Sequence, residues 1–199
     1  MQSVVKNFYK LSSHYYSSAQ ILWAEIFNMP CIYNPTIYLL RHSTELALKG
    51  LIVKEFLLLD PYLATKNIEI KNGASSRKLD ATHSLLCLWE NYKELYLNSH
   101  LVARYDLKQK QIIEKAITFF DKKDFDSTLF RYPYNRKWEP IVIEHLDFDT
   151  SGKAPELKST PPKIIICEGE VATIKKGSRY LQQTQQLFNA TELLLSFYS

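Results

Sequence analysis

The stretch PTIYLLRHSTELALKGLIVKEFLLL, residues 35–59, decides the fold. Its apolar side chains lie on nearly every side of a 3.6-residue helix, and such a helix packs against neighbours on several sides. Pro35 stands at its start, where a proline is tolerated because the N–H that it lacks would have no partner in the first turn. The sequence therefore predicts a central helix over 35–59 with other elements around it.

Four further segments have helical patterning. In residues 3–27 the apolar side chains recur at steps of three and four, which is typical of an amphipathic helix. A third helix is expected to start near Thr82, whose hydroxyl can cap it. A fourth is expected over about 106–122, and a last one over 178–197. The apolar stripe predicted for the first helix consists of Val4, Phe8, Leu11, Tyr15, Ala19, Leu22 and Ile26.

Two regions lack this periodicity. Residues 60–80 are rich in turn formers and are interpreted as a loop. Five prolines interrupt residues 130–176, in which PIVIEHLDF and KIIICEGEVATI are β-branched runs that predict two short strands. The expected fold class is therefore all-α, a bundle of four to five helices. A single domain over 1–199 carries a short β-hairpin or irregular insertion before its last helix.

The composition narrows the class of protein. Hydrophobic residues make up 46% of the 199 residues, enough for one domain with a core, and 25 basic against 21 acidic residues give a net charge of +4. That charge permits a polyanionic partner without requiring one. The N-terminus lacks the apolar core of a signal peptide, and no run of about 20 apolar residues is present. We therefore expect a cytoplasmic protein that does not enter a membrane.

Several kinds of chemistry have no signal in the sequence. The three cysteines, Cys31, Cys87 and Cys167, are widely spaced and odd in number, so neither a disulfide framework nor a CxxC metal site is expected. No phosphate-binding glycine loop, HExxH or GxSxG motif occurs, so NTP hydrolysis, zinc proteolysis and serine hydrolysis are not indicated. We expect no metal and no cofactor.

A polar stripe interrupts the central helix. Arg41, His42, Glu45 and Lys49 share an arc of roughly 100°, because positions three, four and seven apart lie on one face. A buried charge without a partner costs several kcal/mol, so these groups either pair with one another or line a wet cleft. One interpretation is a salt-bridged stripe that orients the bundle. The other is a polar cleft that receives a ligand.

Three phrases resemble the bacterial HEPN superfamily: YLLRHSTELALKGLI, then RKLDATHSLLCLW, and later LFRYP. The resemblance implies a helical bundle, frequently dimeric, that binds nucleotide or RNA or cleaves RNA without metal. By position, Glu45 and Lys49 match the superfamily's ELALK-type element, and His83 matches the His of its HDL-like helix start. Arg131, Tyr132 and Pro133 match its RYP element. Ser84 departs from the pattern, since superfamily members usually carry Asp after this His.

The superfamily's ribonucleases also carry an Arg followed four to six residues later by His. Arg77 and His83 have this spacing. A neutral His can take the proton of a ribose 2′-hydroxyl while an Arg stabilises the charge on phosphorus. However, Arg77 falls in the predicted loop and His83 at a helix start, so the alternative is that both are loop and capping residues.

A second Arg/His pair is Arg41 with His42. Adjacent helical residues point about 100° apart, which hinders joint action on one phosphate within a chain. In a dimer, His42 of one chain can meet Arg41 or Arg131 of the other. Near Arg131, the sequence FRYPYNRKW mixes cations with aromatic rings, which suits either nucleic-acid contact or a packed turn.

The preferred function is binding of RNA or a nucleotide phosphate in a polar cleft, in a toxin–antitoxin or phage-defence system. The residues expected to line this cleft are His42, Glu45, Lys49, His83 and Arg131, with Tyr132 beside Arg131. One alternative is a metal-independent endoribonuclease that uses an Arg/His pair. A further alternative is a non-catalytic partner of a nucleotidyltransferase-like protein. The expected partners are RNA or nucleotide, a second copy of the chain in a homodimer, and an antitoxin or nucleotidyltransferase-like protein.

Overall fold

The computed structural model describes residues 3–26, 32–62, 68–99, 107–123, 164–167, 170–173 and 179–198. The helices in these ranges are α1 (Ser3–Ala24), α2 (Tyr33–Leu59), α3 (Leu85–Ser99), α4 (Leu107–Lys123) and α5 (Arg179–Ser196). Two antiparallel hairpins pair β1 (Glu69–Asn72) with β2 (Ser75–Lys78) and β3 (Ile164–Cys167) with β4 (Glu170–Thr173). The predicted helical fold class is confirmed.

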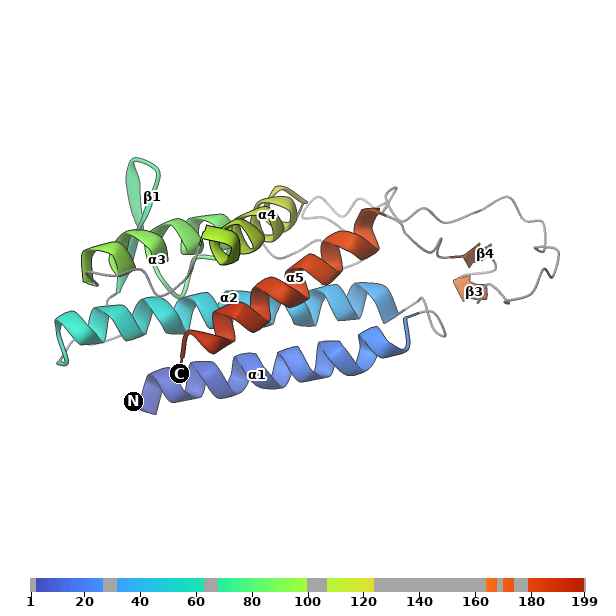
Figure 1. Ribbon diagram of the computed structural model, residues 1–199, viewed down its shortest axis with the longest axis horizontal. Helices are drawn as coiled ribbons and strands as arrows, with labels where there is room; N and C mark the ends of the chain where they lie inside the picture. The colour runs from blue at the N-terminus through green and yellow to red at the C-terminus, as the bar shows by residue number, and fades with distance from the viewer. Residues whose placement is uncertain are drawn as a thin grey trace.

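The helix α2 forms the centre of the bundle, as its sequence predicts. It contacts α1, α3 and α5, whereas α4 packs on α3 and α5. Figure 1 shows α2 between α1 below and α3 with α4 above, while α5 crosses in front. Of its 27 residues, 17 are buried, among them Arg41, Glu45 and Lys49. The apolar circumference of α2 is therefore used on several sides.

Small side chains bring α1 close to α2. Ser12 is fully buried, and its hydroxyl donates to the carbonyl of Ser43 at 2.8 Å, while the Ser43 hydroxyl donates to the carbonyl of Ser12 at 2.8 Å. Leu11, which the sequence placed on the buried stripe, is 47% exposed. That placement was wrong because the contact between α1 and α2 is made here by Ser12 and Ser43, each bonding the other's backbone, and not by an apolar side chain.

The start of α3 also differs from the prediction. The helix begins at Leu85, and the backbone N–H of Cys87 donates to the hydroxyl of Ser84 at 3.1 Å, so Ser84 caps it. Thr82 instead donates its hydroxyl to the carbonyl of Lys78 at 3.0 Å. The predicted cap was two residues too early because both hydroxyls fit the local pattern, and only the path of the preceding turn distinguishes them.

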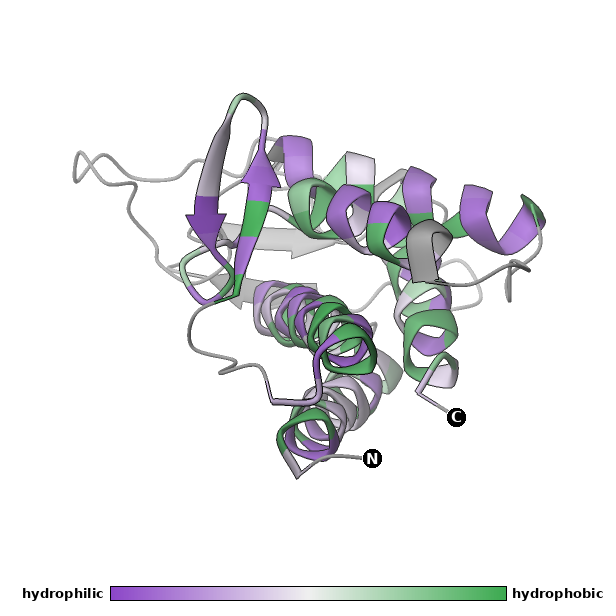
Figure 2. Ribbon diagram, turned by 90° about the vertical axis from the view of Figure 1, so that its left-hand side faces the viewer, coloured by the Kyte–Doolittle hydropathy of each residue, from purple (hydrophilic) through white to green (hydrophobic). Residues whose placement is uncertain are grey.

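The loop predicted over residues 60–80 contains a hairpin. Strands β1 and β2 pair with Asn72 opposite Ser75, and Gly73 between them has φ of +63°, a value that glycine adopts at little cost. Asn91 of α3 clamps β1 to the bundle, because its side chain accepts from the Lys71 N–H and donates to the Lys71 carbonyl, both at 2.8 Å. The hairpin projects on the side of the bundle opposite α1 (Figure 2).

The second predicted β region is described only in part. The run KIIICEGEVATI supplies both strands of one hairpin, with Ile164 opposite Thr173 and Cys167 opposite Glu170. The strand expected in PIVIEHLDF lies outside the described residues, as does the segment around Arg131.

No helix in the described part of the chain combines the length and the apolar character needed to cross a membrane.

Candidate functional site

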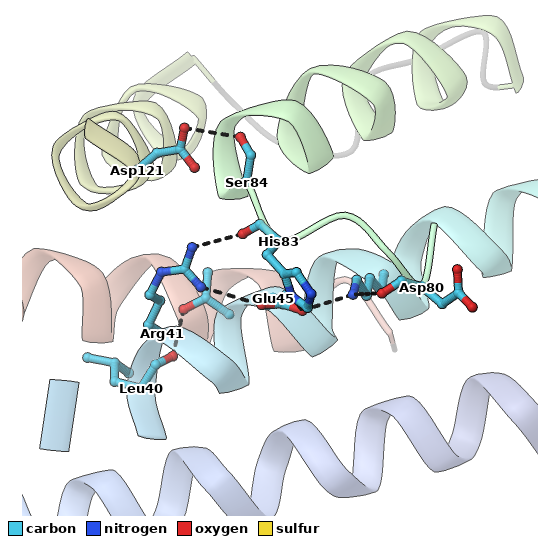
Figure 3. A network of polar contacts seen from close by, with 9 residues as sticks. Leu40, Arg41, Glu45, Asp80, His83, Ser84 and Asp121 are labelled. Carbon is cyan, nitrogen blue, oxygen red and sulfur yellow. Dashed lines mark hydrogen bonds and ion pairs between the residues drawn. The ribbon is translucent and has the colours of Figure 1, made fainter. Parts of the chain in front are cut away.

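Glu45 is the centre of a buried polar network. Its Oε1 accepts hydrogen bonds from Lys49 Nζ at 2.8 Å and lies 3.0 Å from His83 Nδ1. Its Oε2 accepts from Arg41 Nη1 at 3.4 Å. Glu45 is only 2% exposed, so all three contacts are made away from bulk water. Figure 3 shows Arg41, Glu45 and His83 converging between α2 and the segment that precedes α3.

The two cations of α2 also hold the backbone of that segment. Arg41 Nη2 donates to the carbonyl of His83 at 2.8 Å, and Lys49 Nζ donates to the carbonyl of Asp80 at 3.2 Å. Hydrogen bonds from charged donors are stronger than neutral ones. The stretch from Asp80 to His83 is therefore held on α2 at both ends through its main-chain carbonyls.

The surroundings of Glu45 keep it ionised. Burial acts to raise the pKa of this carboxyl, but the positive charges of Lys49, His83 and Arg41 and the hydrogen bond from Lys49 outweigh burial and lower the pKa below its ordinary value. An ionised carboxylate only accepts hydrogen bonds, so Nδ1 of His83 carries a proton. The second ring nitrogen, Nε2, is then left to accept or donate a proton.

His83 is the member of the network that reaches the surface. Its side chain is 49% exposed, whereas Arg41, Glu45 and Lys49 are buried. An imidazole held at Nδ1 by a buried carboxylate has a fixed orientation and tautomer, which suits proton transfer at Nε2. The arrangement offers one oriented, accessible imidazole, supported by three buried side chains.

Ser84 and Asp121 extend the network to α4. The hydroxyl of Ser84 donates to Asp121 Oδ2 at 3.1 Å, and both residues are buried. Asp121 thus places a carboxylate beside the N-terminus of α3, where negative charge is favoured. The resemblance leads one to expect an Asp directly after His83, and this chain has Ser84 there. The carboxylate near the start of α3 comes from Asp121 of α4.

The structure brings together four of the residues predicted from sequence: Arg41, Glu45, Lys49 and His83. The ion pairs Arg41–Glu45 and Glu45–Lys49 are both present. Arg41, proposed from sequence as a catalytic residue, is 1% exposed, and its guanidinium bonds Glu45 and the His83 backbone. It acts by holding His83 in place.

His42 lies apart from this group. Its ring meets Tyr15 of α1 edge to face, with 4.7 Å between ring centroids, and stacks near-parallel to Tyr38 at 5.9 Å. Neighbouring residues on a helix point in different directions, and the adjacent Arg41 faces Glu45. The sequence pair Arg41–His42 is therefore divided between two sides of α2.

Arg77 lies on β2, which is exposed along its whole length, and the network around Glu45 does not include it. The end of β2 is nevertheless joined to His83 by a tight turn. The carbonyl of Lys78 accepts hydrogen bonds from the Ala81 N–H at 3.2 Å and from the Thr82 hydroxyl at 3.0 Å. Thr82 is the residue directly before His83. Arg131 and Tyr132 lie outside the described residues.

Sequence reasoning did not anticipate the roles of Asp80, Ser84 and Asp121. Asp80 contributes a carbonyl, which every residue has, and Asp121 is an ordinary polar residue near the end of an amphipathic helix. Ser84 carries a usable signal, since a serine immediately before an apolar helix is a favoured cap.

No group of three or more His, Cys, Asp or Glu side chains among the described residues is arranged to hold a metal ion. Comparison with known proteins found no match for this chain among protein-family models, curated proteins or solved structures.

Proposed function

We propose that this protein binds RNA or a nucleotide phosphate at the surface formed by His83 and the end of the β1–β2 hairpin. The observation that carries the proposal is the half-exposed His83 imidazole, held at Nδ1 by the buried Glu45 carboxylate. An imidazole with a fixed ring position can donate from Nε2 to a phosphate oxygen when protonated. The HEPN resemblance supports the same ligand class, and with it a dimeric, toxin–antitoxin or phage-defence setting.

The end of β2 adds exposed positive charge just before the turn that leads to His83. Arg77 and Lys78 are exposed on β2, and their side chains make no ion pair with any other described residue. Arg41 and Lys49, by contrast, spend their donors on Glu45 and on backbone carbonyls. The ligand surface is therefore assigned to the hairpin end and His83, in place of the cleft along the α2 stripe predicted from sequence.

The binding test measures the affinity for a fluorescently labelled single-stranded RNA at increasing salt. The double variant Arg77→Ala/Lys78→Ala removes two phosphate contacts, so the slope of log affinity against log salt should fall by about 1.4, since each single-strand contact accounts for about 0.7. The matched control is Lys6→Ala/Lys10→Ala, which removes two exposed charges from α1 on the opposite side of the bundle. Salt-independent affinity, or an equal loss in both double variants, contradicts the proposal.

A second candidate function, metal-independent cleavage of RNA, is favoured by the Glu45–His83 contact itself. In this reaction Nε2 of His83 takes the proton of a ribose 2′-hydroxyl, the 2′-oxygen bonds to phosphorus, and the bond from phosphorus to the 5′-oxygen breaks. The 5′-oxygen leaves as a hydroxyl after accepting a proton from solvent. The products are a 2′,3′-cyclic phosphate and a 5′-hydroxyl end.

The cleavage test incubates the protein with RNA in the presence of EDTA and identifies the ends of the fragments. His83→Ala should abolish cleavage, because no other described group takes the place of the imidazole at the end of the Glu45 network. His14→Ala, at an exposed position of α1, and His42→Ala should leave cleavage unchanged. If neither protein cleaves RNA and His83→Ala binds it more weakly than the parent protein, the function is binding alone.

A further inference from the structure

A cavity lies between α1, α2 and the base of the β1–β2 hairpin, at the end of the bundle where α1 begins and α2 ends (Figure 1). Its volume is about 250 Å³. An apolar cavity of roughly 150 Å³ can hold benzene, so this one has room for a benzene ring with a short substituent. The lining residues are Val4, Phe8, Lys49, Val53, Ile68, Leu79 and Asp80.

The floor of the cavity is apolar. Val53 of α2 is buried, as are Ile68 and Leu79 at the base of the hairpin. The Leu79 N–H donates to the Ile68 carbonyl at 2.9 Å, so these two backbone groups are already paired. The floor therefore recognises a ligand by apolar contact and not by hydrogen bonding to these groups.

The side of the cavity that a ligand reaches most easily belongs to α1. Val4 and Phe8 stand four residues apart, on one face of the helix, and both are only half-buried. Their accessible surface is apolar, and covering it with an apolar ligand removes it from water, which is favourable. A flat ring placed against the Phe8 ring and the Val4 methyl groups makes this contact.

The charges at the cavity are already matched. Lys49 Nζ donates to Glu45 Oε1 at 2.8 Å and to the Asp80 carbonyl at 3.2 Å. The carboxylate of Asp80 is at the surface, and Figure 3 shows it directed away from Glu45. An ion that enters the cavity loses water and finds no free counter-charge among the lining residues, which is unfavourable. The balance of charge therefore favours an uncharged ligand.

We propose that this cavity binds a small uncharged molecule with an apolar ring, of about the size of a substituted benzene. The ring lies against Val4 and Phe8 and above the floor formed by Val53 and Leu79. Among the described residues that line the cavity, none belongs to the RNA surface proposed above. The two proposals are therefore independent, and the tests below use no RNA.

The first experiment titrates the full chain with benzyl alcohol, benzoate and benzylammonium by isothermal titration calorimetry. The three probes share one framework and differ mainly in charge. Benzyl alcohol should bind saturably at one site per chain, and each ion should bind at least about tenfold more weakly, because it is dehydrated without a new partner. Equal or tighter binding of either ion overturns the proposal, and so does the absence of saturable binding of benzyl alcohol.

Val4→Phe tests where the probe binds. The larger side chain occupies the accessible side of the cavity, so the affinity for benzyl alcohol should fall at least about tenfold. Leu22→Phe is the matched control, because Leu22 is also half-buried on α1 but does not line the cavity, and it should change the affinity less than about twofold. Equal losses in the two variants contradict the proposed site. His83→Ala should bind benzyl alcohol as the parent chain does.

A second measurement needs no substitution and remains informative if Val4→Phe does not fold. In protein with ¹³C-labelled methyl groups of Val, Leu and Ile, the ring protons of bound benzyl alcohol should show NOEs to the methyl groups of Val4 and Leu79. Ile21, Leu58 and Leu59 are exposed apolar side chains away from the lining. If no NOE reaches Val4 or Leu79, or if the NOEs are confined to such exposed side chains, the proposal fails.

Discussion

At the scale of single residues, Gly50 sets how closely three parts of the chain approach. A Cβ at this position of α2 would lie 2.6 Å from the Cβ of Phe8 in α1 and would also clash with the hydroxyl of Tyr198. That hydroxyl donates to the carbonyl of Ala47 at 2.7 Å and is buried. Neither neighbour can move without disturbing a helix contact, so the absence of a side chain at Gly50 is a packing requirement.

We predict that Gly50→Ala destabilises the protein by about 1–3 kcal/mol, the usual cost of overfilling a packed interior. Alanine favours a helix over glycine by about 1 kcal/mol, so a gain in stability would show that the contact is looser than described. Urea unfolding at neutral pH measures the difference. Ser18→Ala, at an exposed position of α1, should change the free energy of unfolding by less than about 0.5 kcal/mol.

At the scale of elements, the start of α3 is the junction on which the site depends. His83 immediately precedes the cap residue Ser84, and the two face different partners: His83 contacts Glu45 on α2, and Ser84 contacts Asp121 on α4. The cap therefore fixes where α3 begins and, through the adjacent residue, the direction in which the imidazole leaves the backbone.

Replacement of Ser84 by alanine should lower the free energy of unfolding by about 1–2 kcal/mol, because the helix loses its cap and Asp121 loses a donor. Ser84→Thr keeps the hydroxyl and should restore most of this loss. Thermal and urea unfolding of the two variants give the comparison. If Ser84→Ala is as stable as the parent protein, the cap at Ser84 is wrong.

At the scale of the whole molecule, the Glu45 network couples α2 to the turn before α3, while hydroxyl contacts join α2 to α5. Tyr33 and Thr184 are 3.0 Å apart, and Thr44 and Thr191 are 2.7 Å apart, although each pair is separated by roughly 150 residues in the chain. The buried charges at Glu45 therefore lie inside a closed bundle, and their titration should affect global unfolding.

The sign of the pH dependence follows from the lowered pKa of Glu45. A carboxyl whose pKa in the folded state lies below its ordinary value of 4.5 stabilises the fold above that pH, and this contribution is lost as the pH falls through the lowered value. The parent protein should therefore lose stability below about pH 4.5. Glu45→Gln should lack this part of the loss, so the two free energies of unfolding should converge as the pH falls.

At pH 7, Glu45→Gln should cost about 3–5 kcal/mol, because the buried ammonium of Lys49 loses the carboxylate that it pairs with. Glu94→Gln provides the control: its ion pair with Lys71 is exposed, with side-chain exposures of 51% and 72%, and its removal should cost less than about 1 kcal/mol. Urea unfolding across the acid range measures both variants. Parallel pH curves for the parent protein and Glu45→Gln would contradict the assigned role of this carboxylate.

Much of the fold could be predicted because it is local. Each helix bears its own 3.6-residue pattern, and the predicted span 35–59 agrees with α2 within two residues. The β1–β2 hairpin was interpreted as a loop because its strands are four residues long and mostly exposed, so they lack an alternating apolar pattern. Its turn residue Gly73 marks a bend but does not by itself define the strands on either side.

The candidate site could be predicted only as a set of residue types. The α2 positions Arg41, Glu45 and Lys49 share a face for reasons of helix geometry that spacing reveals. His83 joins them only because of the turn after β2. Arg41 and Lys49 also bond the main-chain carbonyls of His83 and Asp80, and every residue has such a carbonyl. No pattern of side chains indicates which backbone oxygens will lie within reach of a cation.

By itself, the sequence determined the five helices and the central place of α2, since periodicity and apolar circumference are properties of a segment taken alone. The tertiary structure alone decided which charges are buried, that His83 keeps its imidazole at the surface, and that Asp121 has an oxygen without a partner in the described chain. The physical reason is that burial and hydrogen-bond satisfaction are properties of surroundings, and here those surroundings come from segments far apart in the chain.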